Sequence, residues 1–191
     1  MDLVNELGKP LNILDIGGTQ QYWNLMGLDD PAIKVTLLNL TQESTTSPNF
    51  SSVAGDATDL SIYGDDSFDV VYSNSVIEHL FTKENQRKMA KEVMRVGKYF
   101  FVQTPNYYFP LEPHFLIPGF QFLPKWIRSS MLQKFNLGHI SRIENSVEAR
   151  SKVEEIRLLS INEMKELFPE SFIWKERVGG LVKSIVAHNL N

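Results

Sequence analysis

The feature that most restricts the fold of this chain is the segment at residues 12–19, NILDIGGT, in which an aliphatic run meets an acidic residue and then two glycines. Aliphatic and β-branched residues without alternation are typical of a strand buried on both faces of a parallel sheet. The glycines permit a tight turn and a close approach of the backbone to a ligand. This pattern predicts the first strand of an α/β sheet that binds a nucleotide or nucleoside.

Polar residues also follow other strand-like runs of the chain. The runs are 34–38 before Asn39, 53–55 before Asp56, and 68–72 before Ser73 and Asn74. In a doubly wound sheet, ligands bind outside the carboxyl ends of the parallel strands. We therefore expect these side chains and Asp15 to lie at one edge of the sheet and to line one pocket.

Helix signals alternate with these runs. Residues 84–96 carry one apolar face and one basic face, and Gly97 ends the pattern before a further strand-like run at 99–103. Ser160 and Glu163 have the spacing of a capping box at the start of another helix. This alternation favours a parallel sheet with helices on both faces.

Taken in order, the motifs resemble those of class I S-adenosylmethionine-dependent methyltransferases of the type 11 kind. They are ILDIGGT, LLNL, GDATDL, SFDVVYSNSVIEHL and YFFVQTPN, and they run from about residue 12 to 105. The resemblance implies a doubly wound, Rossmann-like sheet of seven strands, mostly parallel, with an antiparallel C-terminal hairpin at 171–179 and 183–189. We expect one methyltransferase domain over residues 1–191, with a lid insertion at about 105–150.

The resemblance also implies S-adenosylmethionine as cofactor and assigns its binding residues. These are Asp15, Gly17, Gly18, Thr19, Asn39, Leu40, Asp56, Ala57, Ser73 and Asn74. The glycine turn would leave room for the methionine part, Asp15 would order that turn, and Asp56 would read the adenine edge. At Asn39 most relatives have a carboxylate that holds the ribose hydroxyls. Because hydrogen bonds to charged groups contribute ~1.5–3 kcal/mol against ~0.5–1.5 kcal/mol for neutral ones, we expect roughly tenfold weaker cofactor binding than a carboxylate would give.

Two histidines are the candidates for acid–base chemistry, His114 in the lid insertion and His79 after the fourth strand. Methyl transfer to oxygen requires removal of the hydroxyl proton, and histidine is the natural base for that step. Local packing is the other role open to both. Glu78 and His79 also resemble part of the Glu-x-x-Glu-His motif of a metal-dependent subset, but Ser75 replaces its first glutamate. Such a ligand set is poor for a hard metal ion, so we expect no metal.

The segment at 105–135 is rich in proline and aromatic residues, and a helix is expected within about 124–135. A structureless insertion of this length in a compact domain is usually functional. It could wall an apolar pocket, form a peripheral membrane contact through its aromatic and basic residues, or fill the core under the lid.

Composition narrows the function classes further. A net charge of −4 and the absence of a basic cluster oppose nucleic-acid binding, and the chain has no cysteine for thiolate chemistry or disulfides. No signal peptide or membrane span is evident, so we expect a cytoplasmic location. The function expected is methyl transfer to a small-molecule or lipid-like acceptor, at oxygen. The alternatives are a catalytically degenerate partner subunit and, less favoured, an RNA methyltransferase.

Overall fold

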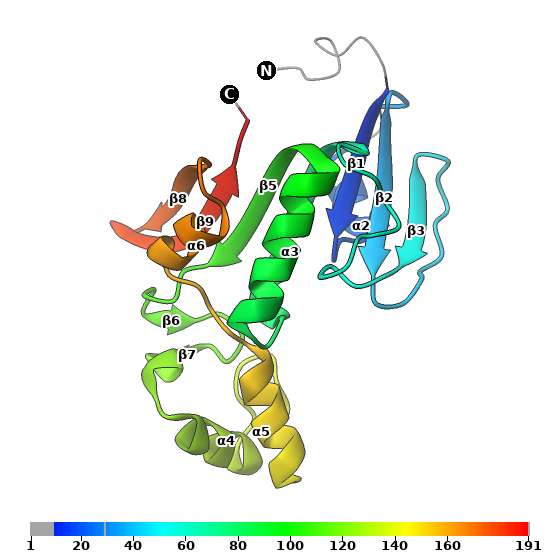
Figure 1. The fold of residues 1–191 in the computed structure, drawn as a ribbon. Helices are drawn as coiled ribbons and strands as arrows, with labels where there is room; N and C mark the ends of the chain where they lie inside the picture. The colour runs from blue at the N-terminus through cyan, green and yellow to red at the C-terminus, as the bar shows by residue number, and fades with distance from the viewer. Residues whose placement is uncertain (1–9, 29, 191) are drawn as a thin grey trace.

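The computed structural model describes residues 10–28 and 30–190. Its main sheet has seven strands in the order β3-β2-β1-β4-β5-β9-β8 (Figure 1). Strands β1 to β5 pair in parallel, whereas β9 pairs antiparallel with both β5 and β8. The expected fold class, a mostly parallel sheet that ends in an antiparallel C-terminal hairpin, is confirmed.

The parallel strands are β1 (Leu11–Ile16), β2 (Ile33–Asn39), β3 (Phe50–Ala54), β4 (Phe68–Asn74) and β5 (Gly97–Pro105). The C-terminal hairpin consists of β8 (Phe172–Val178) and β9 (Leu181–His188). The helices beside the sheet are α2 (Gln20–Leu25), α3 (Lys83–Val96) and α6 (Ile161–Leu167), with a 3-10 turn, η1 (Ile77–His79), after β4.

The central strands are rich in aliphatic residues because both faces of the sheet are covered. On β1, Leu11 and Ile13 pack into one hydrophobic cluster, and Leu14 and Ile16 pack into the cluster on the other face. The second cluster includes the buried face of α3, where Met89 and its neighbours project from the amphipathic helix that the sequence predicts. Successive strand residues alternate between faces, so one aliphatic run serves both layers.

Helix ends follow their local sequence signals. Thr82 caps α3 by accepting a hydrogen bond from Asn85 N, and Gly97 lies at its C-cap. Ser160 and Glu163 form the expected capping box of α6. These caps satisfy backbone N–H groups that have no partner within the helix.

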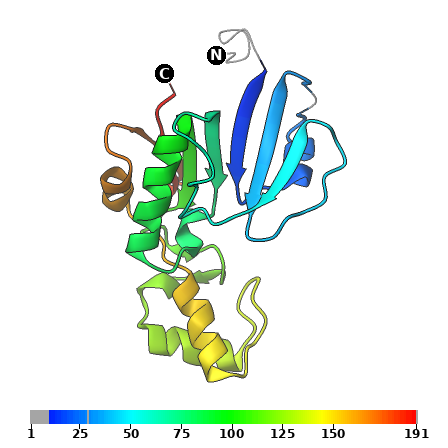
Figure 2. The same cartoon turned by 45° about the vertical axis from the view of Figure 1, so that its right-hand side comes forward.

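Residues 106–158, named the lid here, lie beyond the carboxyl ends of the parallel strands (Figures 1 and 2). The lid has more elements than the one helix that was expected in it. They are β6 (Leu111–Glu112), β7 (Ile117–Pro118), η2 (Phe120–Phe122), α4 (Lys125–Lys134) and α5 (Ser146–Glu155). Helix α4 coincides with the expected helix, and α5 packs against it as an element that the sequence did not predict.

The aromatic residues of the lid divide into a buried and an exposed set. Phe115 and Phe120 are fully buried in a separate hydrophobic cluster, together with Leu132 from α4 and Ala149 and Val153 from α5. The exposed set is Tyr108, Phe122, Trp126 and Phe135. Part of the segment therefore fills a core of its own, while a membrane contact by the exposed set stays a prediction. Among the described residues, no helix combines the length and the apolar character needed to cross a bilayer.

Candidate functional site

The first part of the site is a small cavity of about 130 Å³ at the carboxyl ends of β1 and β4. Its lining residues are Asp15, Gly17, Gly18, Thr19, Tyr22, Tyr72 and Asn74. The structure thus brings together half of the cofactor residues assigned from the sequence. The cavity is smaller than the ~300–1,000 Å³ usual for ligand pockets, so a bound nucleoside would extend out of it along the strand ends.

Asp15 forms the floor of this cavity. Its carboxylate is 1% exposed, and its Oδ2 accepts a hydrogen bond of 2.6 Å from the indole Nε1 of Trp23. The other oxygen, Oδ1, is buried and has no hydrogen-bond partner among the described residues. Burial raises the pKa of Asp15 to about 6, against the lowering effect of the hydrogen bond from Trp23. A buried acceptor without a partner is a ready site for a cationic or N–H group of a ligand.

The two glycines after β1 are required by the protein's own packing. A Cβ on Gly18 would lie 1.6 Å from Oδ2 of Asp15, and one on Gly17 would lie 2.3 Å from Val76. Gly17 also has a φ of +80°, which favours glycine. Their missing side chains make room for Asp15 and Val76, while the expectation that the glycines also leave room for the cofactor stays a prediction.

Asn39 and Asp56 lie at the ends of the neighbouring strands and already have partners. Asn39 Nδ2 donates to the carbonyl of Gly18 at 2.9 Å, which fixes the glycine turn and leaves the amide oxygen of Asn39 as acceptor. Asp56 Oδ1 accepts from the backbone N–H and the hydroxyl of Thr58, both at 2.8 Å, so only Oδ2 is left for an adenine amine. Ala57 is buried and Leu40 is exposed.

Ser73 and Asn74 have different environments at the end of β4. Ser73 is fully buried, and its hydroxyl lies 3.4 Å from the carbonyl of Ile16, so its side chain joins β4 to β1. Only its backbone remains for the cofactor role expected of it. Asn74 is exposed and lines the cavity. Ser75, next in sequence, has a φ of 58° and donates to Gln103 Oε1 at 3.0 Å.

Tyr22 and Tyr72 complete the cavity and were not found from the sequence. Their hydroxyl oxygens lie 2.6 Å apart, and their rings stack with centroids 6.1 Å apart. Burial and the contact with Tyr22 raise the pKa of Tyr72. The only sequence signal was positional: Tyr22 lies on the first turn of the helix after the glycines, and Tyr72 lies two residues before the end of β4.

The second part of the site is a chain of polar side chains where the lid meets the sheet. Nδ1 of His114 contacts Oε1 of Glu112 at 2.7 Å, and the Nε2 atoms of His114 and His79 lie 3.2 Å apart. Nδ1 of His79 faces Oε1 of Glu155 at 3.4 Å. Sequence-distant segments, the β6–β7 turn, η1 and the end of α5, thus bring both histidine candidates together.

Two buried glutamates, Glu112 and Glu78, lie next to the two histidines. Glu112 is 2% exposed and also accepts from the backbone N–H groups of His114 and Phe115, at 2.8 and 2.7 Å. Glu78 is fully buried; its Oε2 accepts from the hydroxyl of Thr104 at 2.9 Å, and its Oε1 has no partner among the described residues. Burial raises the pKa of Glu78 to about 7. Sequence reasoning named neither Glu112 nor Glu155 as a site residue, because their relation to the histidines exists only in the folded lid.

The two histidines differ in their electrostatics. Burial and the neighbouring His114 lower the pKa of His79. Burial also opposes the charged form of His114, but the hydrogen bond and charge of Glu112, with the charges of Glu78 and Glu155, raise the pKa of His114 overall.

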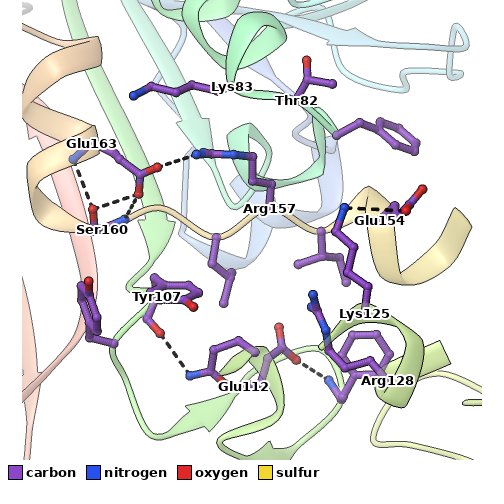
Figure 3. A pocket seen from close by; sticks show the side chains of 16 residues that line it. Thr82, Lys83, Tyr107, Glu112, Lys125, Arg128, Glu154, Arg157, Ser160 and Glu163 are labelled. Atoms are coloured by element: carbon purple, nitrogen blue, oxygen red, sulfur yellow. Dashed lines mark hydrogen bonds and ion pairs between the residues drawn. The ribbon is translucent and has the colours of Figure 1, made fainter. Parts of the chain in front are cut away.

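A larger cavity of about 480 Å³ opens beside the two histidines and their glutamates, between the lid and the start of α3 (Figure 3). Its wall includes Tyr107, Glu112, Lys125, Arg128 and Arg157. Lys125 is paired with Glu154 at 3.7 Å, and Arg157 with Glu163. The size is that of a pocket for a small organic molecule. Through Glu112 the cavity shares a wall with the histidine chain.

Comparison with known proteins agrees with the fold. The model of the methyltransferase domain family matches residues 9–99. A SAM-dependent methyltransferase of Methanosarcina mazei has a TM-score of 0.53 at 14% identity, with 100% of this chain and 98% of that chain covered. A Burkholderia thailandensis 1,6-didemethyltoxoflavin-N1-methyltransferase, solved with its substrate and S-adenosylhomocysteine, has a TM-score of 0.54 at 16% identity, with 97% and 73% covered.

A sequence relative covers only a short segment. An uncharacterized protein of Mycobacterium tuberculosis is 40% identical over 53 residues, which are 28% of this chain and 18% of that protein. The matched segment thus spans less than a fifth of that relative.

The chain therefore shares the fold of S-adenosylmethionine-dependent methyltransferases of known structure, and its residues 9–99 match the methyltransferase domain family. The residues at the strand ends fit the cofactor of that class. The unpartnered Oδ1 of Asp15 can accept from the methionine ammonium group, while the free oxygens of Asn39 and Asp56 can accept from the ribose and the adenine.

Proposed function

We propose that this protein transfers the methyl group of S-adenosylmethionine to a hydroxyl oxygen of a small-molecule or lipid-like acceptor. In this step the bond between the sulfonium and its methyl group breaks as a carbon–oxygen bond forms. S-adenosylhomocysteine leaves, and the hydroxyl proton passes to a histidine ring nitrogen and from there to solvent. Because the sulfonium is already activated, the protein mainly has to orient the reactants and exclude water.

The observation that carries this proposal is the pair of histidines where the lid meets the sheet, with their Nε2 atoms 3.2 Å apart. Asn74 lines the cofactor cavity, and His79 follows it on the short η1 turn. Glu112 fixes the ring of His114 through a contact of 2.7 Å at Nδ1, and we infer that one of the two facing Nε2 atoms takes the proton of the acceptor hydroxyl.

The neighbouring cavity supports a small acceptor. Its volume of about 480 Å³ suits one organic molecule, and Tyr107 and Tyr108 contribute aromatic surface to its wall. The lid therefore supplies both the acceptor pocket and one of the two histidines, while the sheet supplies the cofactor residues.

The test is transfer of labelled methyl from S-adenosylmethionine to a panel of phenols, sugars and lipid alcohols. His79→Ala and His114→Ala should each lower kcat by about 10²-fold or more, since positioned acid–base groups contribute about 10²–10⁴-fold. His139→Ala is the matched control, because this exposed histidine lies outside the cluster. Full turnover in both variants would contradict the proposed role of the pair. Cofactor binding without transfer to any acceptor would favour the partner-subunit alternative.

A further inference from the structure

The two histidines face each other through their Nε2 atoms, 3.2 Å apart, and two unprotonated nitrogens at that distance would repel each other. Nδ1 of His114 contacts Glu112 at hydrogen-bond distance, 2.7 Å, while Nδ1 of His79 lies 3.4 Å from Glu155 and has no hydrogen-bond partner among the described residues. A neutral imidazole carries one proton, and the carboxylate at Nδ1 of His114 holds it there. The Nε2 atom of His114 is then a lone pair that faces Nε2 of His79. Either a proton on Nε2 of His79 or a metal ion between the two rings satisfies this contact.

We propose that Glu78, His79 and His114 bind a divalent transition-metal ion, with zinc as the best fit. One ring nitrogen of each histidine and one carboxylate oxygen of Glu78 all lie within 4.8 Å of one another. Nitrogens at ~2.0–2.1 Å from a tetrahedral zinc ion are about 3.3 Å apart. The observed separation of 3.2 Å matches that geometry without any movement of the rings.

The ligand chemistry selects the class of metal. Two imidazoles and one carboxylate are a common ligand set of catalytic zinc sites, which keep the fourth position open. Magnesium and calcium prefer all-oxygen coordination, so this set disfavours them. The sequence argued against a hard metal because Ser75 replaces a glutamate, and the structure agrees that Ser75 points elsewhere, to Gln103. The expectation of no metal judged Glu78, His79 and His114 as a site for a hard ion, and the present proposal replaces it with a softer ion on the same three residues.

Glu78 is the second, independent sign of a missing ligand. It is fully buried, and its Oε1 has no hydrogen-bond partner among the described residues. A buried carboxylate oxygen without a partner is costly unless a cation compensates it. Nearby lysines and arginines do not compensate Glu78: among the described residues none forms an ion pair with it, and Lys152 pairs instead with Glu155 at 2.8 Å.

Glu112 and Glu155 would form the outer shell of the site. In metal sites a ligating histidine usually donates its other ring nitrogen to a carboxylate or carbonyl, which fixes the ring and raises its basicity. Here His114 has such a carboxylate at 2.7 Å, and Glu155 lies 3.4 Å from Nδ1 of His79. Metal binding does not depend on the identity of the acceptor. If the proposed methyl transfer is also correct, the open position would hold the acceptor hydroxyl, and the ion would lower the pKa of that hydroxyl.

The test is calorimetric titration of Zn²⁺ into the full-length protein after treatment with a chelator, with no acceptor present. Cobalt(II) absorption spectra would report the geometry, since tetrahedral coordination gives intense visible bands. Wild type and His139→Ala should bind one ion per chain. His79→Ala and His114→Ala should lose the site, and Glu112→Gln should bind roughly 10–100-fold more weakly.

Circular dichroism of each variant checks that it is folded. If His79→Ala or His114→Ala does not fold, the Glu112→Gln variant, which changes only the outer shell, still tests the site. No stoichiometric binding by the folded wild type, or equal binding by His114→Ala, would overturn the metal site and leave a shared proton between the rings. Zinc binding without methyl transfer would instead refute only the proposed function.

Discussion

Asp15 is the residue on which the cofactor cavity most depends, and its charge state links binding to stability. Burial raises its pKa above the ordinary value of 3.8 to about 6, so the folded chain holds a proton that the unfolded chain releases. The stabilisation from this carboxyl is present below about pH 4 and is lost as pH rises through about 6. Near neutral pH the folded protein therefore carries a costly buried carboxylate.

Asp15→Asn should stabilise the protein at pH 7.5 by about 1–3 kcal/mol, because it removes that buried charge. Near pH 4 the change should be much smaller. Urea unfolding of wild type and variant at both pH values measures the difference. The same variant should bind S-adenosylhomocysteine more weakly, since the free Oδ1 acceptor is altered. An equal change in stability at the two pH values would show that Asp15 is not the group responsible.

Gly18 tests the packing of the turn itself. Gly18→Ala places a Cβ 1.6 Å from Oδ2 of Asp15, so the turn or the carboxylate must move. We expect a loss of about 1–3 kcal/mol in stability and at least tenfold weaker S-adenosylhomocysteine binding. Gly64→Ala is the matched control, because its nearest atom would lie 3.6 Å away. Thermal unfolding and calorimetry give both quantities, and equal behaviour of the two variants would refute the steric argument.

Among the elements, the lid has its own hydrophobic cluster, so it can loosen without the sheet. Leu132 on α4 is fully buried in that cluster. Leu132→Ala should cost about 2–5 kcal/mol in the lid and raise amide hydrogen exchange in α4 and α5. Affinity for S-adenosylhomocysteine should stay within about threefold, since no cofactor residue lies in the lid.

Trp126→Ala on the same helix is the control, because that side chain is 73% exposed. A Leu132→Ala variant that loses cofactor binding along with lid protection would mean that the lid and the sheet form one cooperative unit.

The strands and capped helices could be predicted from the sequence because their signals are local. The aliphatic run of β1, the amphipathic α3 and the capping box of α6 each lie within one short window. Helix α5 was missed because its buried face contains only Ala149 and Val153 among mainly charged residues. Its folding depends on packing against α4, and a contact between two separate segments cannot be seen in a short stretch of sequence.

The site was predictable where residues follow a strand end and unpredictable where the lid contributes. Asp15, Gly17, Gly18 and Asn74 meet as expected. His79 and His114 were named separately, but their contact depends on how the lid docks, and so does the approach of Glu155. Tyr72 was read only as part of an aliphatic strand.

For the whole molecule, we propose that the sheet binds the cofactor and that the lid adds the acceptor cavity and one histidine. The central claim is that S-adenosylmethionine binds at the strand ends. Calorimetric titration of S-adenosylhomocysteine into wild type tests it most directly, with Asp56→Ala as the site variant and Arg87→Ala as a surface control. Arg87 lies on the exposed side of α3, where it pairs with Glu84 at 2.6 Å.

We predict binding of one ligand per chain with micromolar affinity, retained in Arg87→Ala and at least tenfold weaker in Asp56→Ala. Loss of one hydrogen bond to a charged group, about 1.5–3 kcal/mol, corresponds to that change. Absence of binding in folded wild-type protein, or equal affinity in all variants, would contradict the assignment of the cofactor site.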